Sequence, residues 1–279
     1  MELGLMPRVI SNYFEAQDEF NTGTASTPAQ AAHIVAASAS LNYNMLQASG
    51  STLSAGLRVQ HDFFTNFSHA DSTDVDATLD YTSKLGRLNL GYFTTRHRLV
   101  STGVAGSVYD TSQGFTVEYL RNLTSRLRVR ARYRFSHDSY SQFKDRNLTQ
   151  DEFSGDLRLM IKPYFMPGIG YDYARTTVAS RLYDYDRYAP FVTLTSEIGP
   201  AYLTFRYRSA IRRYTAAAPT DSHFGRRDQR DQFTFYGTIG LGRGLSVFAY
   251  EDYIKNHSNV VYGNFRTNEA GVGLFYQFH

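Results

Sequence analysis

Apolar and polar residues alternate with period two along many segments of this chain, and this alternation constrains the fold more than any other feature. In the clearest segment, 126–135, every second residue is Arg and the residues between them are Leu, Val, Ala, Tyr and Phe. Successive side chains of a β-strand point to opposite faces, whereas a helix would spread the two classes around its circumference. The alternation therefore predicts strands.

The same pattern recurs along the chain, and the connections between its segments alternate between short and long. Further alternating segments are 53–60, 75–81, 203–208 and 270–278. Short breaks lie near residues 49–50, 83–84, 123–124, 163–164, 197–199 and 242–244. Longer polar segments are 18–30, 65–72, 96–112, 137–150, 175–187, 213–230 and 255–267. These breaks divide the chain into fourteen strands.

Fourteen strands in 279 residues leave about 20 residues for each strand and its connection, which suits strands of about 9–11 residues tilted across a bilayer. An even strand number with short turns at one end and long loops at the other is typical of outer-membrane barrels. We therefore expect residues 1–279 to form one all-β domain, a transmembrane antiparallel up-and-down β-barrel with short periplasmic turns and long extracellular loops. The alternative, a soluble β-sandwich, would have to pack charged faces into its core at high cost.

Composition excludes several other classes. The absence of Cys rules out disulfide scaffolds, thiolate metal sites and cysteine nucleophiles. No stretch approaches eighteen consecutive apolar residues, so no transmembrane helix is expected. The net charge of +3 is small for a nucleic-acid-binding protein, and no nucleic-acid partner is expected. Residues 1–9 lack signal-peptide features, which indicates a mature form or the end of a longer protein.

Tyrosines are abundant, with 22 in the chain and no Trp. Near strand ends in a barrel, their phenol groups are expected to lie at the level of the lipid head groups. The candidates are Tyr13, Tyr43, Tyr81, Tyr133, Tyr164, Tyr202 and Tyr253.

The final segment, GVGLFYQF at 271–278, resembles the last strand of Gram-negative outer-membrane β-barrels. In that class, a terminal strand with alternating apolar residues and a final Phe is the signal read by the barrel assembly machinery. The resemblance implies this role for Leu274, Tyr276 and Phe278, although His279 follows the Phe here. It also implies a bacterial outer-membrane location, with outer-membrane lipids, lipopolysaccharide and the assembly machinery as partners.

A narrower resemblance covers the last fifty residues. Arg227-Asp228, the strand pair through Tyr253, 256–259 and 266–268 resemble the ends of porin-like families. These include barrels that follow periplasmic tetratricopeptide repeats, such as the surface lipoprotein assembly modifiers and the polysaccharide exporters. No such repeat is found in this sequence. The resemblance implies a possible periplasmic or secreted protein partner.

Arginines on the polar faces are the main candidates for lining the lumen, because the opposite orientation would place them in hydrocarbon at about 2–4 kcal/mol each near the midplane. The expected pore-lining residues are Arg126, Arg128, Arg130, Arg132, Arg134, Arg158, Arg206, Arg208, Arg212 and Arg58, with Asp76 and Asp80. Opposed basic and acidic walls would set up a field across an open lumen. Alternatively, the charges pair across strands and fill the barrel, and Glu118 is expected roughly opposite Arg128.

Two long loops are candidates for closing the lumen. The segment 96–112 contains Gly103 and Gly106, which would allow it to fold inward. The alternative is that this segment is exposed to solvent. The segment 213–230 contains Pro219 and several arginines, and could form a constriction or contact a partner.

The chain is not expected to be an enzyme or to hold a metal or cofactor. His257 and Ser258 resemble the His/Ser region of outer-membrane lipid A deacylases, with Glu269 downstream. One residue separates His from Ser in those enzymes, whereas adjacent residues of a strand point to opposite faces. The Asp pairs at 74/76 and 184/186 are a weak cation signal.

The sequence thus favours a porin-like or export channel whose partly basic lumen prefers anionic solutes or an anionic polymer. The first alternative is the barrel component of a secretion or assembly complex that docks a protein partner. The second is a lipid-modifying enzyme, which would require His257 and Ser258 to converge in a loop.

Overall fold

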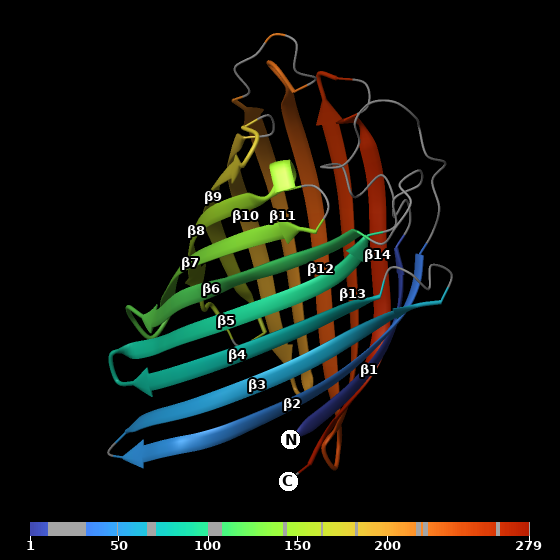
Figure 1. The fold of residues 1–279 in the computed structure, drawn as a ribbon. Coiled ribbons are helices and arrows are strands. Elements are labelled where there is room, and N and C mark those ends of the chain that lie inside the picture. The colour runs from blue at the N-terminus through green and yellow to red at the C-terminus, as the bar shows by residue number, and fades with distance from the viewer. Residues whose placement is uncertain are drawn as a thin grey trace.

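The chain forms a closed antiparallel β-barrel of fourteen strands, as the alternation predicts (Figure 1). The computed structural model describes residues 1–10, 32–48, 50–65, 71–99, 108–141, 144–162, 164–181, 184–215, 219, 223–260 and 263–278. Every strand pairs with its neighbours in chain order, and β1 pairs with β14. Closure leaves no free sheet edge, which satisfies the backbone hydrogen-bonding groups of every strand.

All strands except β1, which has nine residues, are longer than the 9–11 residues expected. They are β1 Glu2–Ile10, β2 Ala32–Ala48, β3 Ser51–Phe64, β4 Ser72–Ser83, β5 Gly86–Leu99, β6 Val108–Asn122, β7 Leu127–Tyr140, β8 Leu148–Leu159, β9 Met166–Val178, β10 Tyr185–Ile198, β11 Ala201–Tyr214, β12 Arg227–Gly242, β13 Leu245–Ser258 and β14 Phe265–Gln277. A short 3-10 helix, η2 (Lys144–Arg146), precedes β8. No helix in the described part of the chain is long and apolar enough to cross a membrane.

The six short connections lie where the sequence predicts them, and the extra strand length comes from the long-loop end. For example, β7 runs to Tyr140 and β8 begins at Leu148, so much of the expected loop 137–150 is strand. The β12–β13 turn is made possible by glycine, since Gly242 and Gly244 have φ of 90° and 81°. The centre of the expected loop 96–112 lies outside the described residues.

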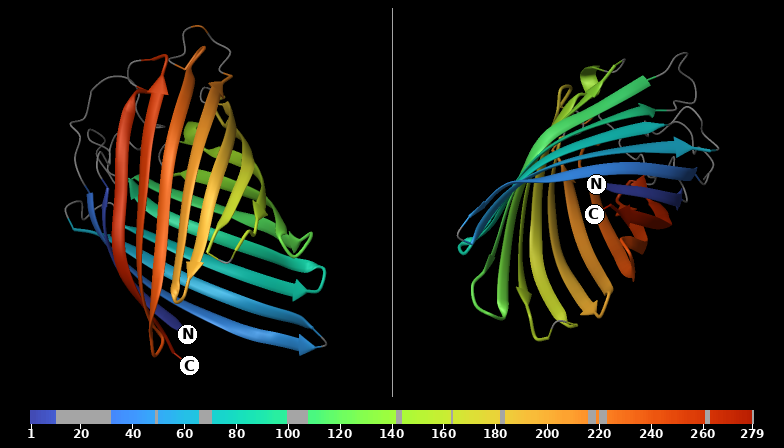
Figure 2. Two further views of the ribbon diagram at one scale, coloured as in Figure 1. Left: turned by 180° about the vertical axis from the view of Figure 1, so that it is seen from behind. Right: turned by 90° about the horizontal axis from the view of Figure 1, so that it is seen from below.

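The two walls of the barrel cross obliquely. Strands β2–β6 slope across the front of Figure 1, whereas β9–β13 rise steeply behind them, and Figure 2 shows the same crossing from behind and from below. Such tilt is a general property of closed barrels. The two termini lie together at the short-turn end, where Phe278 N–H donates to the Met1 carbonyl at 2.9 Å (Figure 1).

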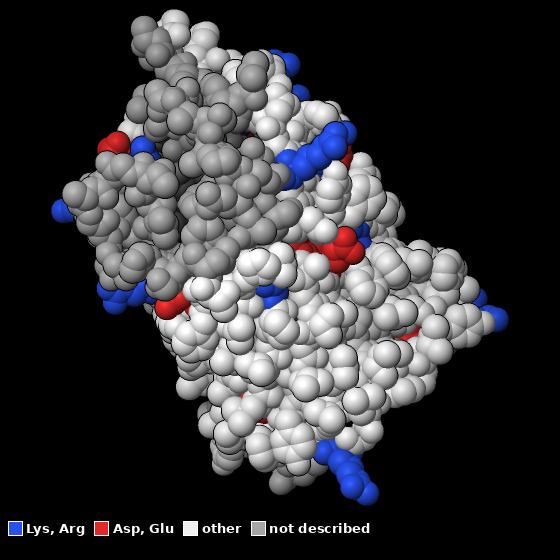
Figure 3. All heavy atoms as spheres, turned by 90° about the vertical axis from the view of Figure 1, so that its right-hand side faces the viewer, with Lys and Arg blue, Asp and Glu red and all other residues white. Residues whose placement is uncertain are grey.

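The two faces of each strand have different chemistry. On the outer face of β14, Val272, Leu274 and Tyr276 are exposed, and Leu41 and Leu57 are paired exposed neighbours on β2 and β3. Figure 3 shows that one side of the barrel is built mostly of uncharged residues. The opposite face of each strand points into the barrel and carries most of the strand charges. The outer face is therefore suited to hydrocarbon and the inner face to water.

Most of the expected tyrosine girdle lies on the outer face. Tyr43, Tyr81 and Tyr164 are exposed, and Tyr253 packs against Phe233 on the same side. The expectation for Tyr202 is wrong. Tyr202 lies four residues before Arg206 on β11, so both side chains are on the inner face. Tyr13 lies outside the described residues.

The interior is packed at the long-loop end and open at the short-turn end. On the inner face of β2, Ala32, Ile34 and Ala36 are at most 2% exposed, whereas Asn42 and Asn44 on the same face are exposed. Because β2 runs from the long-loop end to a short turn, burial decreases along the barrel axis towards the periplasmic end. The lumen is therefore asymmetric along its axis.

Adjacent residues Leu41 and Asn42 provide a test of which face meets lipid. Leu41→Arg should lower the free energy of unfolding by about 2–4 kcal/mol, because it places a guanidinium on the lipid side near the midplane. Asn42→Arg, on the inner face of the same strand, should have a much smaller effect. Urea unfolding of both variants in lipid vesicles measures the difference, and equal losses would contradict the assigned faces.

Candidate functional site: a charged and polar lumen

The arginine ladder of β7 faces a set of carboxylates on the neighbouring strand β8. Asp156 accepts from Arg130 Nε at 2.5 Å and from Arg158 Nε at 2.8 Å, and its side chain is fully buried. Arg130 also lies 3.8 Å from Glu118 on β6. One inward carboxylate on β8 thus holds two of the arginines predicted to line the lumen.

A second carboxylate joins strands that are not neighbours. Glu152 on β8 accepts from Arg132 on β7 at 2.7 Å through Oε1 and from Arg187 on β10 at 2.6 Å through Oε2. Arg187 reaches Glu152 across β9, where the residue between them in the register is Ala174, which is fully buried. The small side chain leaves room for the arginine to lie over the sheet.

The third carboxylate is Asp172 on β9, whose side chain is 1% exposed. Its Oδ2 lies 2.6 Å from Arg206 and 3.5 Å from Arg208, both on β11, and Ser154 donates to its Oδ1 at 2.6 Å. The Arg206 guanidinium lies 3.9 Å from the centre of the Phe191 ring. Contacts that skip a strand are possible because the concave face brings alternate strands together, so these side chains line the interior.

The remaining arginines of the predicted set have different surroundings. Arg128 donates to Asn122 at 3.0 Å, and Arg134 lies 4.2 Å from the centre of the Phe93 ring. Arg212 is 6% exposed and lies over Tyr185. Arg126 precedes β7 and is exposed in the β6–β7 turn, so its inclusion in the strand is corrected.

That turn also corrects the expected pairing of Glu118. Four residues, 123–126, connect β6 to β7, where a two-residue break was expected. The longer turn shifts the register, so Glu118 lies opposite Arg132 and Asn122 lies opposite Arg128.

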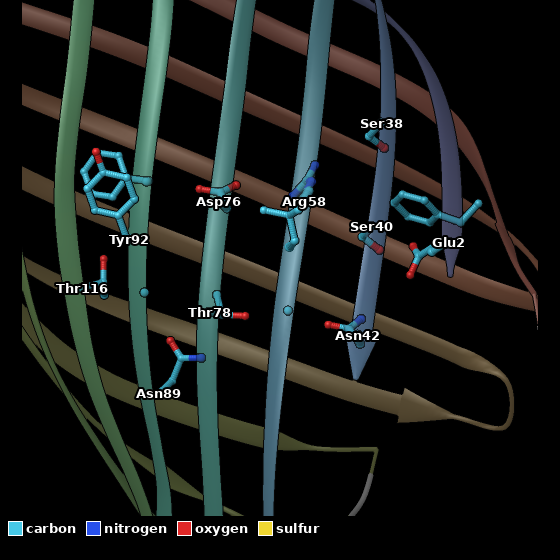
Figure 4. A pocket seen from close by; sticks show the side chains of 15 residues that line it. Glu2, Ser38, Ser40, Asn42, Arg58, Asp76, Thr78, Asn89, Tyr92 and Thr116 are labelled. Carbon is cyan, nitrogen blue, oxygen red and sulfur yellow. The ribbon is translucent and has the colours of Figure 1, made fainter. Parts of the chain in front are cut away.

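The open half of the lumen contains a polar cavity of about 480 Å³ at the level of β1–β6. Arg58 and Asp76 face each other across β3 and β4, and Figure 4 shows both beside the cavity. The Glu2 carboxylate on β1 also lines the cavity, and the remaining polar lining is neutral: Ser38, Ser40, Asn42, Thr78, Asn89, Tyr92 and Thr116. Asp80 lies nearer the short turn, where it accepts from Arg87 at 2.7 Å.

An ion-pair cluster fastens the seam between the first and last strands. Arg8 on β1 contacts Asp62 on β3 and lies 3.2 Å from Glu269 on β14, which also accepts from Tyr250 on β13. These four side chains join strands on both sides of the seam near its long-loop end.

Part of the segment 213–230 closes the wall at the long-loop end. Arg226 is 1% exposed and donates to both oxygens of Asp228, at 2.9 and 2.8 Å. Asn259 accepts from the Arg227 backbone and donates to the Gly225 carbonyl, which ties this segment to the β13–β14 connection. The described part of the segment therefore packs into the protein. Closure of the lumen by it stays a prediction.

The proposed deacylase-like pair is not assembled. His257 and Ser258 are consecutive residues at the end of β13, opposite Gln229 and Asp228, so their side chains lie on different faces. Among the residues that the structure describes, no group of three His, Cys, Asp or Glu residues could hold a metal ion.

Sequence reasoning missed the carboxylates that organise the site. Glu152 and Asp156 share the inner face of β8 with Arg158, so period-two alternation along 148–159 was a usable signal for both. Asp172 stands in a glycine-rich strand with a weak alternation, and Arg187 was assigned to a loop. Their partners lie on non-adjacent strands, which the sequence pattern does not reveal.

An apolar outer face, a charged interior and closure of fourteen strands define an integral β-barrel of the bacterial outer membrane. The family model of the surface lipoprotein assembly modifier matches residues 17–278, so the chain belongs to this family. This confirms the second resemblance noted in the sequence. No curated protein matches the sequence.

Two solved structures illustrate the fold. Outer-membrane expressed OmpT of Vibrio cholerae has 12% identity and a TM-score of 0.50, with coverage of 100% of this chain and 97% of that chain. The CymD monoaromatic hydrocarbon channel has 8% identity and a TM-score of 0.50, with coverage of 100% and 88%. At such identities, the likeness shows the fold alone.

Glu152 provides a test of the charge network. Glu152→Gln should lower the free energy of unfolding by about 1–3 kcal/mol, because Arg132 and Arg187 would lose the charge that holds them in the half-buried interior. Asp80→Asn is the matched control, since the Arg87 side chain is 55% exposed and its pair should contribute less than about 1 kcal/mol. Urea titrations compare the two variants, and a larger loss for Asp80→Asn would contradict the network.

Proposed function

We propose that the barrel is the outer-membrane component through which a surface lipoprotein is assembled, and that it receives part of this client from the periplasmic side. The observation that carries the proposal is the family match over residues 17–278, because the family is named for the modification of surface lipoprotein assembly. The proposal also agrees with the first alternative drawn from the sequence, in which the barrel docks a protein partner.

The shape of the lumen supports entry from the short-turn end. The polar cavity opens in this half, and its serine, threonine and asparagine side chains can exchange hydrogen bonds with an extended polypeptide without requiring a particular charge. The arginine–carboxylate pairs of β7–β11 cross the middle of the lumen, and the long-loop end is packed and includes the buried Arg226. A client that passes further would have to displace these groups.

The remaining partners follow from the membrane setting. Outer-membrane lipids and lipopolysaccharide would surround the apolar outer face. Leu274, Tyr276 and Phe278 are exposed on or beside β14, where the barrel assembly machinery could read them. These roles stay predictions.

Ser40 tests the proposed client site. Ser40→Trp should reduce surface display of a co-expressed client lipoprotein severalfold, because the indole would occupy the cavity. Ala39→Trp is the control, since Ala39 points to the lipid side of the same strand. Surface labelling in whole cells measures display, and heat-modifiable gel mobility shows that both barrels are folded. Equal display in the two variants would contradict a client site in the cavity.

A second candidate function is conduction of anions, as the sequence first suggested. It is favoured by the excess of inward arginines over carboxylates along β7–β11, since a basic lining biases ion passage. For the barrel to conduct, ions would have to find a path through the packed long-loop half.

The triple variant Arg128→Ser, Arg130→Ser, Arg132→Ser tests this candidate. If the lumen conducts, planar-bilayer recordings under a salt gradient should show a reversal potential shifted away from anion preference. Arg243→Ser, in the exposed β12–β13 turn, is the control. An unchanged reversal potential in the triple variant would remove the selectivity claim and leave the barrel intact.

A further inference from the structure

Five guanidinium groups gather around two carboxylates in the middle of the lumen. They belong to Arg132 and Arg134 on β7, Arg187 on β10, and Arg206 and Arg208 on β11, which we call the arginine cluster. Glu152 contacts two of them and lies opposite Arg134 in the register, whereas Asp172 contacts the other two. Asp138 on β7 and Asp76 on β4 also attract Arg134, and Asp76 is shared with Arg58. Five positive charges against Glu152, Asp172 and Asp138 leave an excess of +2.

A further carboxylate on the same wall, Asp156, does not offset this excess. Asp156 already contacts Arg130 and Arg158, so it is shared by two other cations. An uncompensated positive charge in a half-buried interior is costly, and like charges held together add to the cost. The cluster therefore keeps a net positive charge, which a bound anion would offset.

The cluster also has spare hydrogen-bond donors. The Nε atoms of Arg132, Arg187 and Arg206 are buried, with no acceptor among the described residues. Arg187 as a residue is only 8% exposed. Its position is fixed on both sides, because Glu152 holds its guanidinium and Ala174 lies beneath its side chain. The donors are thus ordered before any ligand arrives.

Packing on β9 and β10 holds the other side of the cluster. The Phe191 ring covers Gly170, where an added Cβ would come within 2.2 Å of the ring. The Arg206 guanidinium in turn lies on Phe191. This stack of Gly170, Phe191 and Arg206 fixes how far the Arg206 guanidinium projects into the lumen.

We propose that the arginine cluster is a binding site for a divalent oxyanion of the phosphate type. Guanidinium groups suit such a ligand, because they donate paired hydrogen bonds to phosphate oxygens and stay charged at any physiological pH. A divalent ion offsets more of the remaining positive charge than chloride can, and its several oxygens can accept from different strands. The site is independent of whether the lumen admits a polypeptide.

The test uses the purified full chain, refolded in detergent, with sodium phosphate replacing sodium chloride at constant ionic strength. Phosphate should raise the Tm saturably, by about 2–4 °C, because it binds only the folded barrel. The double variant Arg187→Gln, Arg208→Gln should lose this increase. Arg58→Gln, which removes an inward arginine of the open half, should retain it. No saturable increase in the native chain, or the same increase in the double variant, would overturn the proposal.

A second measurement needs no variant and covers the case in which the double variant does not fold. Phenylglyoxal modifies accessible arginines, and inorganic phosphate should slow modification of Arg206 and Arg208, whose side chains are 25% and 19% exposed, severalfold while leaving Arg58 unchanged. Mass spectrometry of the peptides gives the rates. Equal protection of all three would indicate general screening and overturn the site.

The source of the phosphate group is distinguished by a third arm. Phosphatidylglycerol presents an anionic phosphate group on a lipid, so vesicles of phosphatidylcholine with and without it isolate the effect of a lipid headgroup. A site inside the barrel wall should respond to free inorganic phosphate in both vesicles. Protection by phosphatidylglycerol alone would overturn an interior site. All three experiments measure anion binding to the purified barrel. A negative result would therefore overturn the anion site without bearing on lipoprotein display in cells.

Discussion

The requirement that every backbone N–H and C=O be paired within hydrocarbon governs this structure. Only a closed sheet or a helix meets it, and this chain meets it by pairing β1 with β14. Closure divides the side chains into two sets, one towards lipid and one towards the lumen. Since the strands alternate, the charges that cannot face lipid must accumulate inside. The crowded, mainly basic interior is thus a direct consequence of the closure.

The interior charges are then arranged by curvature. Glu152 and Asp172 contact arginines two strands away as well as nearer neighbours, which a flat sheet would hold out of reach. Small residues at Ala174 and Gly170 make room for these crossings. The packed network fills the middle of one wall, whereas the polar lining of β1–β6 borders an open cavity. One barrel therefore combines a polar vestibule with a charged barrier.

The fold could be predicted almost completely, because strand number, turn positions and facing all depend on local patterns. Gly242 and Gly244 mark a turn, and the alternation at 270–278 assigns the two faces of β14. Register was less predictable, since two extra residues in the β6–β7 turn moved Glu118 from Arg128 to Arg132. Tyr202 was misplaced because residue type alone does not give its phase within a strand. Of the twelve expected lumen residues, all but Arg126 lie on strands, but their carboxylate partners required the three-dimensional curvature.

The charged barrier also limits how the two candidate functions can coexist. A polypeptide client that enters the vestibule meets the arginine cluster before it reaches the long-loop end, so acidic segments of a client would compete with Glu152 and Asp172 for the same guanidinium groups. A neutral or basic segment could not replace these carboxylates, so the arginines would keep their contacts with Glu152 and Asp172. An ion, by contrast, needs only the gaps between the pairs. The balance between passage of a protein and passage of ions therefore depends on how readily Arg187 and Arg208 exchange one carboxylate for another anion.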